Sequence, residues 1–91
     1  MENKNRFKIS RHEPFIVEGE NGEHKIPHPE KFSIELMEEL TKIDEDIPLA
    51  DKVKIIKGLF LQVCPDLEKE DMSDYDWLHL MSKYDAYVSG E

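Results

Sequence analysis

The sequence predicts an α+β fold that is mainly α-helical, with an N-terminal β-hairpin followed by a three-helix core. Three observations lead to this prediction. An Asn-Gly pair separates two short stretches with alternating apolar residues, three later stretches carry apolar residues at helical spacing, and cap or turn residues bound each helical stretch. We therefore expect one domain over residues 1–91, with the hairpin region at 5–27 and helices at 33–44, 48–64 and 73–88.

Length and composition fit one small acidic domain. The chain has 91 residues, of which 21 are acidic and 12 basic, and its formal net charge is −9. A chain of this size buries only about two-thirds of the surface that it exposes when unfolded, so it has room for one core but not for a large catalytic domain. Four Phe, three Tyr and one Trp supply the apolar bulk that a disordered acidic tail lacks.

The hairpin is predicted from Asn21 and Gly22. A type I′ turn needs positive φ at both central residues, and Asn-Gly adopts it readily. A two-residue loop at this point places Glu18 opposite Lys25, where the two side chains form a cross-strand ion pair.

The same register places Val17 opposite Ile26 and puts both on one apolar face with Phe15. Residues 6–9 also alternate polar and apolar side chains, which predicts a short third strand.

The first helix begins after Ser33, which stands where an N-cap is expected, and it carries its apolar residues on one stripe. This stripe consists of Leu36, Leu40 and Ile43. The acids at 44–46 oppose the dipole at a helix C-terminus, so the helix is expected to stop there.

The second helix is the most apolar element and is expected at the centre of the core, between the other two helices. Pro48 suits its first turn, and Pro65 ends it because proline disfavours helical geometry in the preceding residue. Gly58 lies in the middle of this helix, which predicts the close approach of a neighbouring element.

The third helix begins after Ser73, and Asp76 three residues later resembles the acidic half of a capping box. Its apolar stripe consists of Trp77, Met81, Tyr84 and Val88.

The residues that carry chemistry do not combine into a catalytic or cofactor site in the sequence. His24 and His28 have a four-residue spacing, but they straddle a strand end, and no Cys or carboxylate set completes a zinc site with them. The segment 66–76 is rich in acids, but it lacks the Gly that a calcium loop needs for its sharp turn. Its acidic side chains are therefore expected to be solvated. Cys64 follows an apolar helix and precedes proline, which predicts a buried, inert thiol. We expect no enzyme activity, no cofactor and no metal.

Charge is distributed unevenly along the chain. Residues 1–12 hold four basic side chains and one acid, for +3, whereas residues 66–91 hold eight acids and two bases, for −6. Such a field repels nucleic-acid backbones and membrane surfaces and favours basic protein partners. The first ten residues have no apolar signal region, so a cytoplasmic protein is expected.

A partner surface is predicted from side chains that lie off the apolar stripes of the second and third helices. On the third helix, two tyrosines are left over from the core, and on the second helix, lysines form a basic strip. The candidate residues are Tyr75, Tyr87, Lys52, Lys54 and Lys57.

The order of the elements resembles that of the small tail assembly chaperones of long-tailed phages and of prophages in Gram-positive bacteria. The resemblance rests on the strand pair at 15–19 and 25–27, the acidic helix, the close of the second helix at 59–67 and the segment at 75–81. It implies a non-enzymatic protein of the host bacterial cytoplasm that binds and solubilises the tape measure protein and recruits tail tube protein. Many such proteins are also made as a longer, frameshifted product. No functional residue carries over from the family.

A second function class remains open on the sequence. An acidic regulatory protein, such as a DNA-mimic inhibitor of a basic nucleic-acid-binding protein, has the same charge balance. The inhibitor predicts salt-dependent binding through carboxylates spaced regularly on one face. The chaperone predicts apolar, salt-tolerant contacts and self-association into a homo-oligomer.

Overall fold

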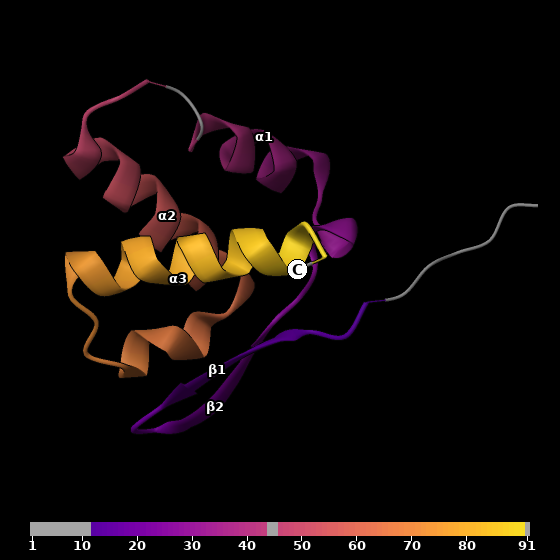
Figure 1. Ribbon diagram of the computed structural model, residues 1–91, viewed down its shortest axis with the longest axis vertical. Helices are drawn as coiled ribbons and strands as arrows, with labels where there is room; N and C mark the ends of the chain where they lie inside the picture. Colours follow the sequence, from indigo (N-terminus) through magenta and orange to yellow (C-terminus); the bar gives the residue numbers. More distant parts are fainter. Residues whose placement is uncertain (1–11, 44–45, 91) are drawn as a thin grey trace, which may run out of the picture.

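A β-hairpin followed by three α-helices makes up the fold, as the sequence predicted (Figure 1). The computed structural model describes residues 12–43 and 46–90. The elements in chain order are β1 (Phe15–Gly19), β2 (Gly22–Ile26), the 3₁₀ turn η1 (Pro29–Lys31), α1 (Ile34–Lys42), α2 (Leu49–Val63), the 3₁₀ turn η2 (Pro65–Lys69) and α3 (Asp74–Val88). The proposed third strand at residues 6–9, like the start of the hairpin region at residue 5, lies outside the described residues.

The helices begin at the caps that the sequence indicated. The Ser33 hydroxyl accepts a hydrogen bond from the Leu36 amide at 3.2 Å. At α3 the capping box is complete, because Asp76 donates its amide to the Ser73 hydroxyl (3.2 Å) and accepts the Ser73 amide on its carboxylate (3.0 Å). These side chains satisfy amides that have no partner within the helix, and they fix where each helix starts.

The two 3₁₀ turns were not predicted, and both begin with proline. Pro29 opens η1 and Pro65 opens η2, where the fixed φ of proline suits a first helical position. Leu67 in η2 is fully buried, so this turn belongs to the core although acids surround it in the sequence. The turn η2 also carries the chain from the end of α2 back to the hairpin (Figure 1).

The predicted register of the hairpin is wrong. The strands pair Val17 with His24 and Gly19 with Gly22, so the turn residues are Glu20 and Asn21. A type I′ turn at Asn21-Gly22 needs positive φ at both residues. Gly22 has a positive φ of 112°, but no described non-glycine residue, and therefore not Asn21, has a positive φ. The type I′ turn at Asn21-Gly22 is thus excluded.

The shift amounts to two residues, and it therefore preserves which face each side chain occupies. Phe15 now lies opposite Ile26, and both still pack on the core. Glu18 lies opposite Glu23, and Lys25 opposite Ile16, so the expected Glu18–Lys25 pairing does not occur.

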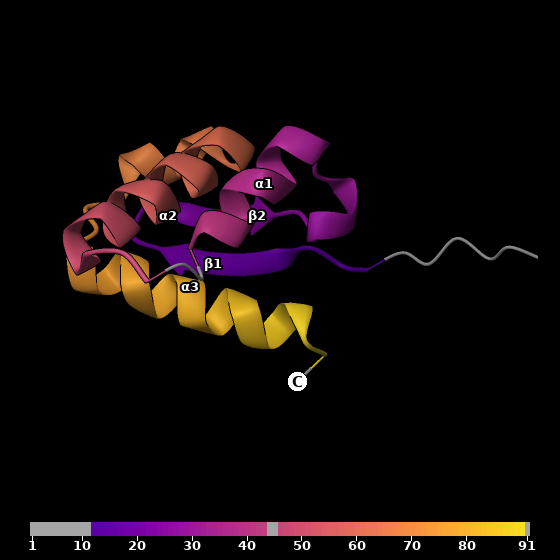
Figure 2. The same cartoon turned by 90° about the horizontal axis from the view of Figure 1, so that it is seen from above.

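The core lies around α2, which contacts both α1 and α3. Turned by 90°, the molecule shows α1 and α2 on one side and α3 on the other (Figure 2). The largest fully buried side chains are Tyr84, Phe60, Ile26, Ile56 and Leu67, drawn from β2, α2, η2 and α3. The helix α1 has no fully buried residue within its bounds. Leu36 and Leu40 of its predicted stripe are half-buried against the core, and Ile43, the residue after the helix, is buried.

No helix within residues 12–43 and 46–90 has the length and apolar character needed to cross a bilayer.

Candidate functional site

An open groove lies between α1 and α2. Its volume is about 450 Å³. It is lined by Glu35, Leu36 and Glu39 of α1 and by Lys54, Ile55, Gly58, Leu59 and Gln62 of α2. The groove thus has apolar side chains along its length and charged side chains at its rims.

Gly58 keeps the middle of this groove open. A methyl group built on its Cα meets no atom within 4 Å, so the predicted close approach of a neighbouring element is wrong. The helix geometry is regular here, because α2 runs without a break from Leu49 to Val63. The glycine therefore leaves space on the α2 surface where any other residue would place a side chain.

The rims of the groove differ in charge. Glu35 and Glu39 lie on the α1 side, and Lys54 lies on the α2 side. Glu39 also accepts a hydrogen bond from Lys42 at 3.0 Å, one turn further along α1. A charged ligand helix would therefore meet different charges on its two flanks.

The structure does not bring the five predicted partner residues together. Lys54 and Lys57 are three residues apart and share an exposed face, but Lys52 points to the other side of α2. Only Lys54 lines the groove. The two tyrosines, Tyr75 and Tyr87, are separated by about 18 Å along α3, at 1.5 Å per residue.

The environments of the two tyrosines also differ. Tyr75 is 74% exposed, with its ring 6.2 Å from that of His79. Tyr87 is half-buried, and its hydroxyl donates a hydrogen bond to the Glu13 carbonyl. Its ring lies 5.4 Å from that of Phe15, so Tyr87 holds the segment before β1 against α3. Burial raises the pKa of Tyr87, which keeps this hydroxyl protonated as a donor.

Glu70 is a buried anchor that the sequence did not reveal, since the acids between 66 and 76 were all expected to be solvated. Its side chain is 8% exposed and reaches back to the hairpin. The carboxylate accepts the amides of Glu20 (3.0 Å) and Asn21 (3.1 Å) and lies 2.7 Å from His24 Nε2. The hydrogen bond from His24, followed by those from the turn amides, holds the pKa of Glu70 below its ordinary value.

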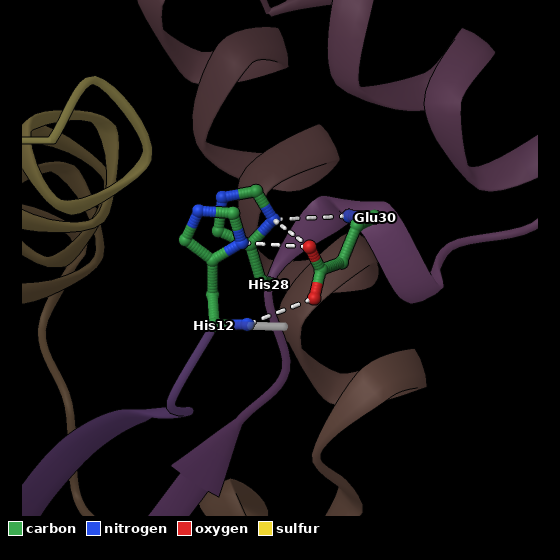
Figure 3. Close-up of side chains that lie close together, drawn as sticks. All are labelled: His12, His28 and Glu30. Atoms are coloured by element: carbon green, nitrogen blue, oxygen red, sulfur yellow. Dashed lines mark hydrogen bonds and ion pairs between the residues drawn. The ribbon is translucent and has the colours of Figure 1, made fainter. Parts of the chain in front are cut away.

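The histidines of the hairpin region have different surroundings, and the spacing of His24 and His28 does not make them neighbours. His24 is buried against Glu70, whereas His28 stacks on His12 with ring centroids 4.0 Å apart. Glu30 completes this second group, with its carboxylate 2.6 Å from His12 Nδ1 (Figure 3). The hydrogen bonds from His12 hold the pKa of Glu30 below its ordinary value. This group could not be predicted from the sequence, because His12 precedes β1 and the other two residues follow β2.

Cys64 is 7% exposed, and burial raises the pKa of its thiol. Both observations agree with the predicted inert thiol, because the thiolate is the reactive form.

No family model, curated protein or solved structure matches this chain.

Proposed function

We propose that this protein is a non-enzymatic binding protein that holds a helical segment of a partner in the groove between α1 and α2. The observation that supports the proposal is the open stretch of α2 at Gly58, flanked by Leu36, Ile55 and Leu59. Its volume of about 450 Å³ lies within the roughly 300–1,000 Å³ typical of ligand sites. An amphipathic helix can place apolar side chains from successive turns into a groove of this kind.

The charges of the rims favour a particular partner helix. Basic residues on one flank of the helix would meet Glu35 and Glu39, and an acidic residue on the other flank would meet Lys54. The net charge of −9 adds a longer-range attraction for a basic partner. Charge of this kind sets orientation and association rate more than final affinity.

The resemblance in element order extends the proposal to a specific role, that of a phage tail assembly chaperone. In that role the groove takes up apolar helical stretches of the tape measure protein, keeps that protein soluble and leaves other surfaces to recruit tail tube subunits. The acidic surface would keep the complex in solution. The contacts would be mainly apolar and therefore tolerant of salt.

Co-expression of the full chain with a candidate tape measure protein tests this role. The expected result is a larger soluble fraction of that protein and a complex that survives size exclusion at high salt. Unchanged solubility without a complex would contradict the chaperone role. Salt-sensitive binding to a basic nucleic-acid-binding protein instead would favour the inhibitor class.

A groove-filling variant tests the site itself. Gly58→Leu adds a side chain to the open stretch, at a position where the added Cβ meets no atom within 4 Å, so the variant should fold and lose the complex. Ala50→Leu is the matched control, since Ala50 is exposed on the same helix and does not line the groove. Binding by Gly58→Leu that equals binding by Ala50→Leu would exclude the groove as the binding site.

A further inference from the structure

The fold gathers two imidazoles and a carboxylate at the base of the hairpin. Nitrogen atoms of His12 and His28 and a carboxylate oxygen of Glu30 all lie within 4.8 Å of one another. Glu30 Oε2 is 2.6 Å from His12 Nδ1 and 3.8 Å from His28 Nδ1. Figure 3 shows both rings side by side with the carboxylate facing them.

The backbone on both sides of the hairpin holds this cluster in place. Glu30 accepts the backbone amide of His12 on its other carboxylate oxygen at 3.0 Å. His28 accepts the Glu30 amide on Nδ1 at 3.1 Å and packs its ring 5.5 Å from that of Tyr87. The segment before β1 and the turn η1 are therefore already joined, and only side-chain rotations are needed to change what the three groups bind.

We propose that His12, His28 and Glu30 form a binding site for a divalent transition-metal ion of the zinc class. Two imidazole nitrogens and one carboxylate oxygen form a donor set that Zn²⁺ uses, with a fourth position open to water or another donor. Donors on one tetrahedral zinc stand about 3.3–3.6 Å apart, given bonds of about 2.0–2.2 Å. The two measured separations from Glu30 Oε2 lie on either side of that range.

Binding exchanges existing hydrogen bonds for metal bonds. The ion replaces the proton between His12 and Glu30. If His12 is a neutral imidazole, that proton moves to Nε2 and none is released; if His12 is an imidazolium, uptake releases one proton to the solvent. If His28 binds the ion through Nδ1, it loses the hydrogen bond that this atom accepts from the Glu30 amide. The side chain of His12 is 51% exposed, which gives an ion access from solvent, and turning its ring toward the ion gives up its stacking on His28.

The donor set also predicts selectivity. Imidazole favours zinc and its transition-metal neighbours, whereas Mg²⁺ and Ca²⁺ prefer sites built from oxygen ligands. The site should therefore bind Zn²⁺ and reject Mg²⁺ at the same concentration.

Titration of the tag-free full-length chain with zinc chloride in a calorimeter tests the site. The expected result is one ion per chain, no heat with magnesium chloride, and NMR shifts of the ring protons of His12 and His28 without shifts at His79. His12→Asn and Glu30→Gln should each weaken binding at least about tenfold, since loss of an outer-shell partner alone typically costs that much.

His79→Asn is the matched control, because His79 is exposed on α3 and lies outside the cluster. It should bind zinc as the unmodified protein does. Circular dichroism establishes that each variant is folded, and His12→Asn is expected to be, since its side chain is largely exposed. An absence of zinc binding, equal binding by His12→Asn and His79→Asn, or shifts centred on His24 or His79 would each overturn the proposal.

Discussion

Glu70 Oε2 lies 2.7 Å from Nε2 of His24, a residue 46 positions earlier in the chain. The two side chains are 8% and 5% exposed, so water does not substitute easily for either partner. Through this contact η2 holds the hairpin, and the same carboxylate binds two amides of the turn.

Acidification should weaken the fold through Glu70. Its pKa is lowered from 4.5 in the folded chain, mainly by the hydrogen bond from His24. A lowered folded-state pKa means that this contribution is present above about pH 4.5 and is lost as the pH falls through the folded value. Urea unfolding between pH 3 and 7 should show the loss. Glu70→Gln should be less stable at neutral pH and should lose less on acidification; an identical pH profile for both proteins would contradict this role.

Two glycines should respond to alanine in opposite directions. A Cβ at Gly19 would lie 2.3 Å from Cδ of Glu70, so Gly19→Ala must displace the carboxylate and should destabilise the protein. Gly58→Ala meets no neighbour within 4 Å and removes a mid-helix glycine, so it should stabilise by about 0.5–1 kcal/mol. Urea midpoints of the two variants measure both effects. A loss of stability in Gly58→Ala would mean that the groove is closed in solution.

Removing the hydroxyl of the buried Tyr84 should lower the free energy of unfolding more than removing the hydroxyl of the half-buried Tyr87. Tyr84 is fully buried, and its hydroxyl donates to the Pro27 carbonyl at 2.5 Å. Tyr84→Phe leaves that acceptor without its donor and should cost about 1–3 kcal/mol of unfolding free energy. Tyr87→Phe removes the bond to Glu13 near solvent and should cost about 1 kcal/mol or less. Denaturant titrations compare the pair, and equal losses would show that burial does not decide the cost.

Removal of the α3 cap should be measurable. Ser73→Ala loses the hydroxyl that accepts the Asp76 amide, and it should destabilise the protein by about 0.5–2 kcal/mol. Ser82→Ala is a matched control, since Ser82 is exposed within α3 and accepts no cap bond. A thermal melt of both variants distinguishes the cap from a general effect of losing serine.

The thiol of Cys64 should react slowly with an aromatic disulfide reagent. Burial both raises its pKa and blocks access, so the folded protein at neutral pH should react far more slowly than the protein in urea. Equal rates would place the thiol at the surface.

The helices could be predicted because their signals are local. Ser33 and Ser73 act within three residues of the amides that they cap, and Pro65 ends α2 through its own ring. The buried face of α3 follows in the same way from apolar spacing, with Trp77 and Tyr84 both in the core. Each of these features depends only on neighbours in sequence, which a single chain displays directly.

The register of the hairpin and the histidine cluster depend on residues far apart in the chain. Asn21 and Gly22 favour one turn locally, but Glu70 binds the amides of a different one. His12 and Glu30 are 18 residues apart and meet only because the hairpin folds back between them. The groove could not be predicted either, since the sequence does not distinguish a glycine that faces a neighbour from one that faces open space.

The order in which the chain is synthesised gives the contact from Glu70 a further consequence. The hairpin leaves the ribosome some 45 residues before its anchor does, and a two-stranded hairpin alone is only marginally stable in water. Until residue 70 has emerged, the segment has no carboxylate to bind Glu20 and Asn21, and its local preference for a turn at Asn21-Gly22 acts unopposed. The hairpin, which is made before the helices, therefore reaches its final pairing only after α1 and α2 have been synthesised, and its strands stay exchangeable until then.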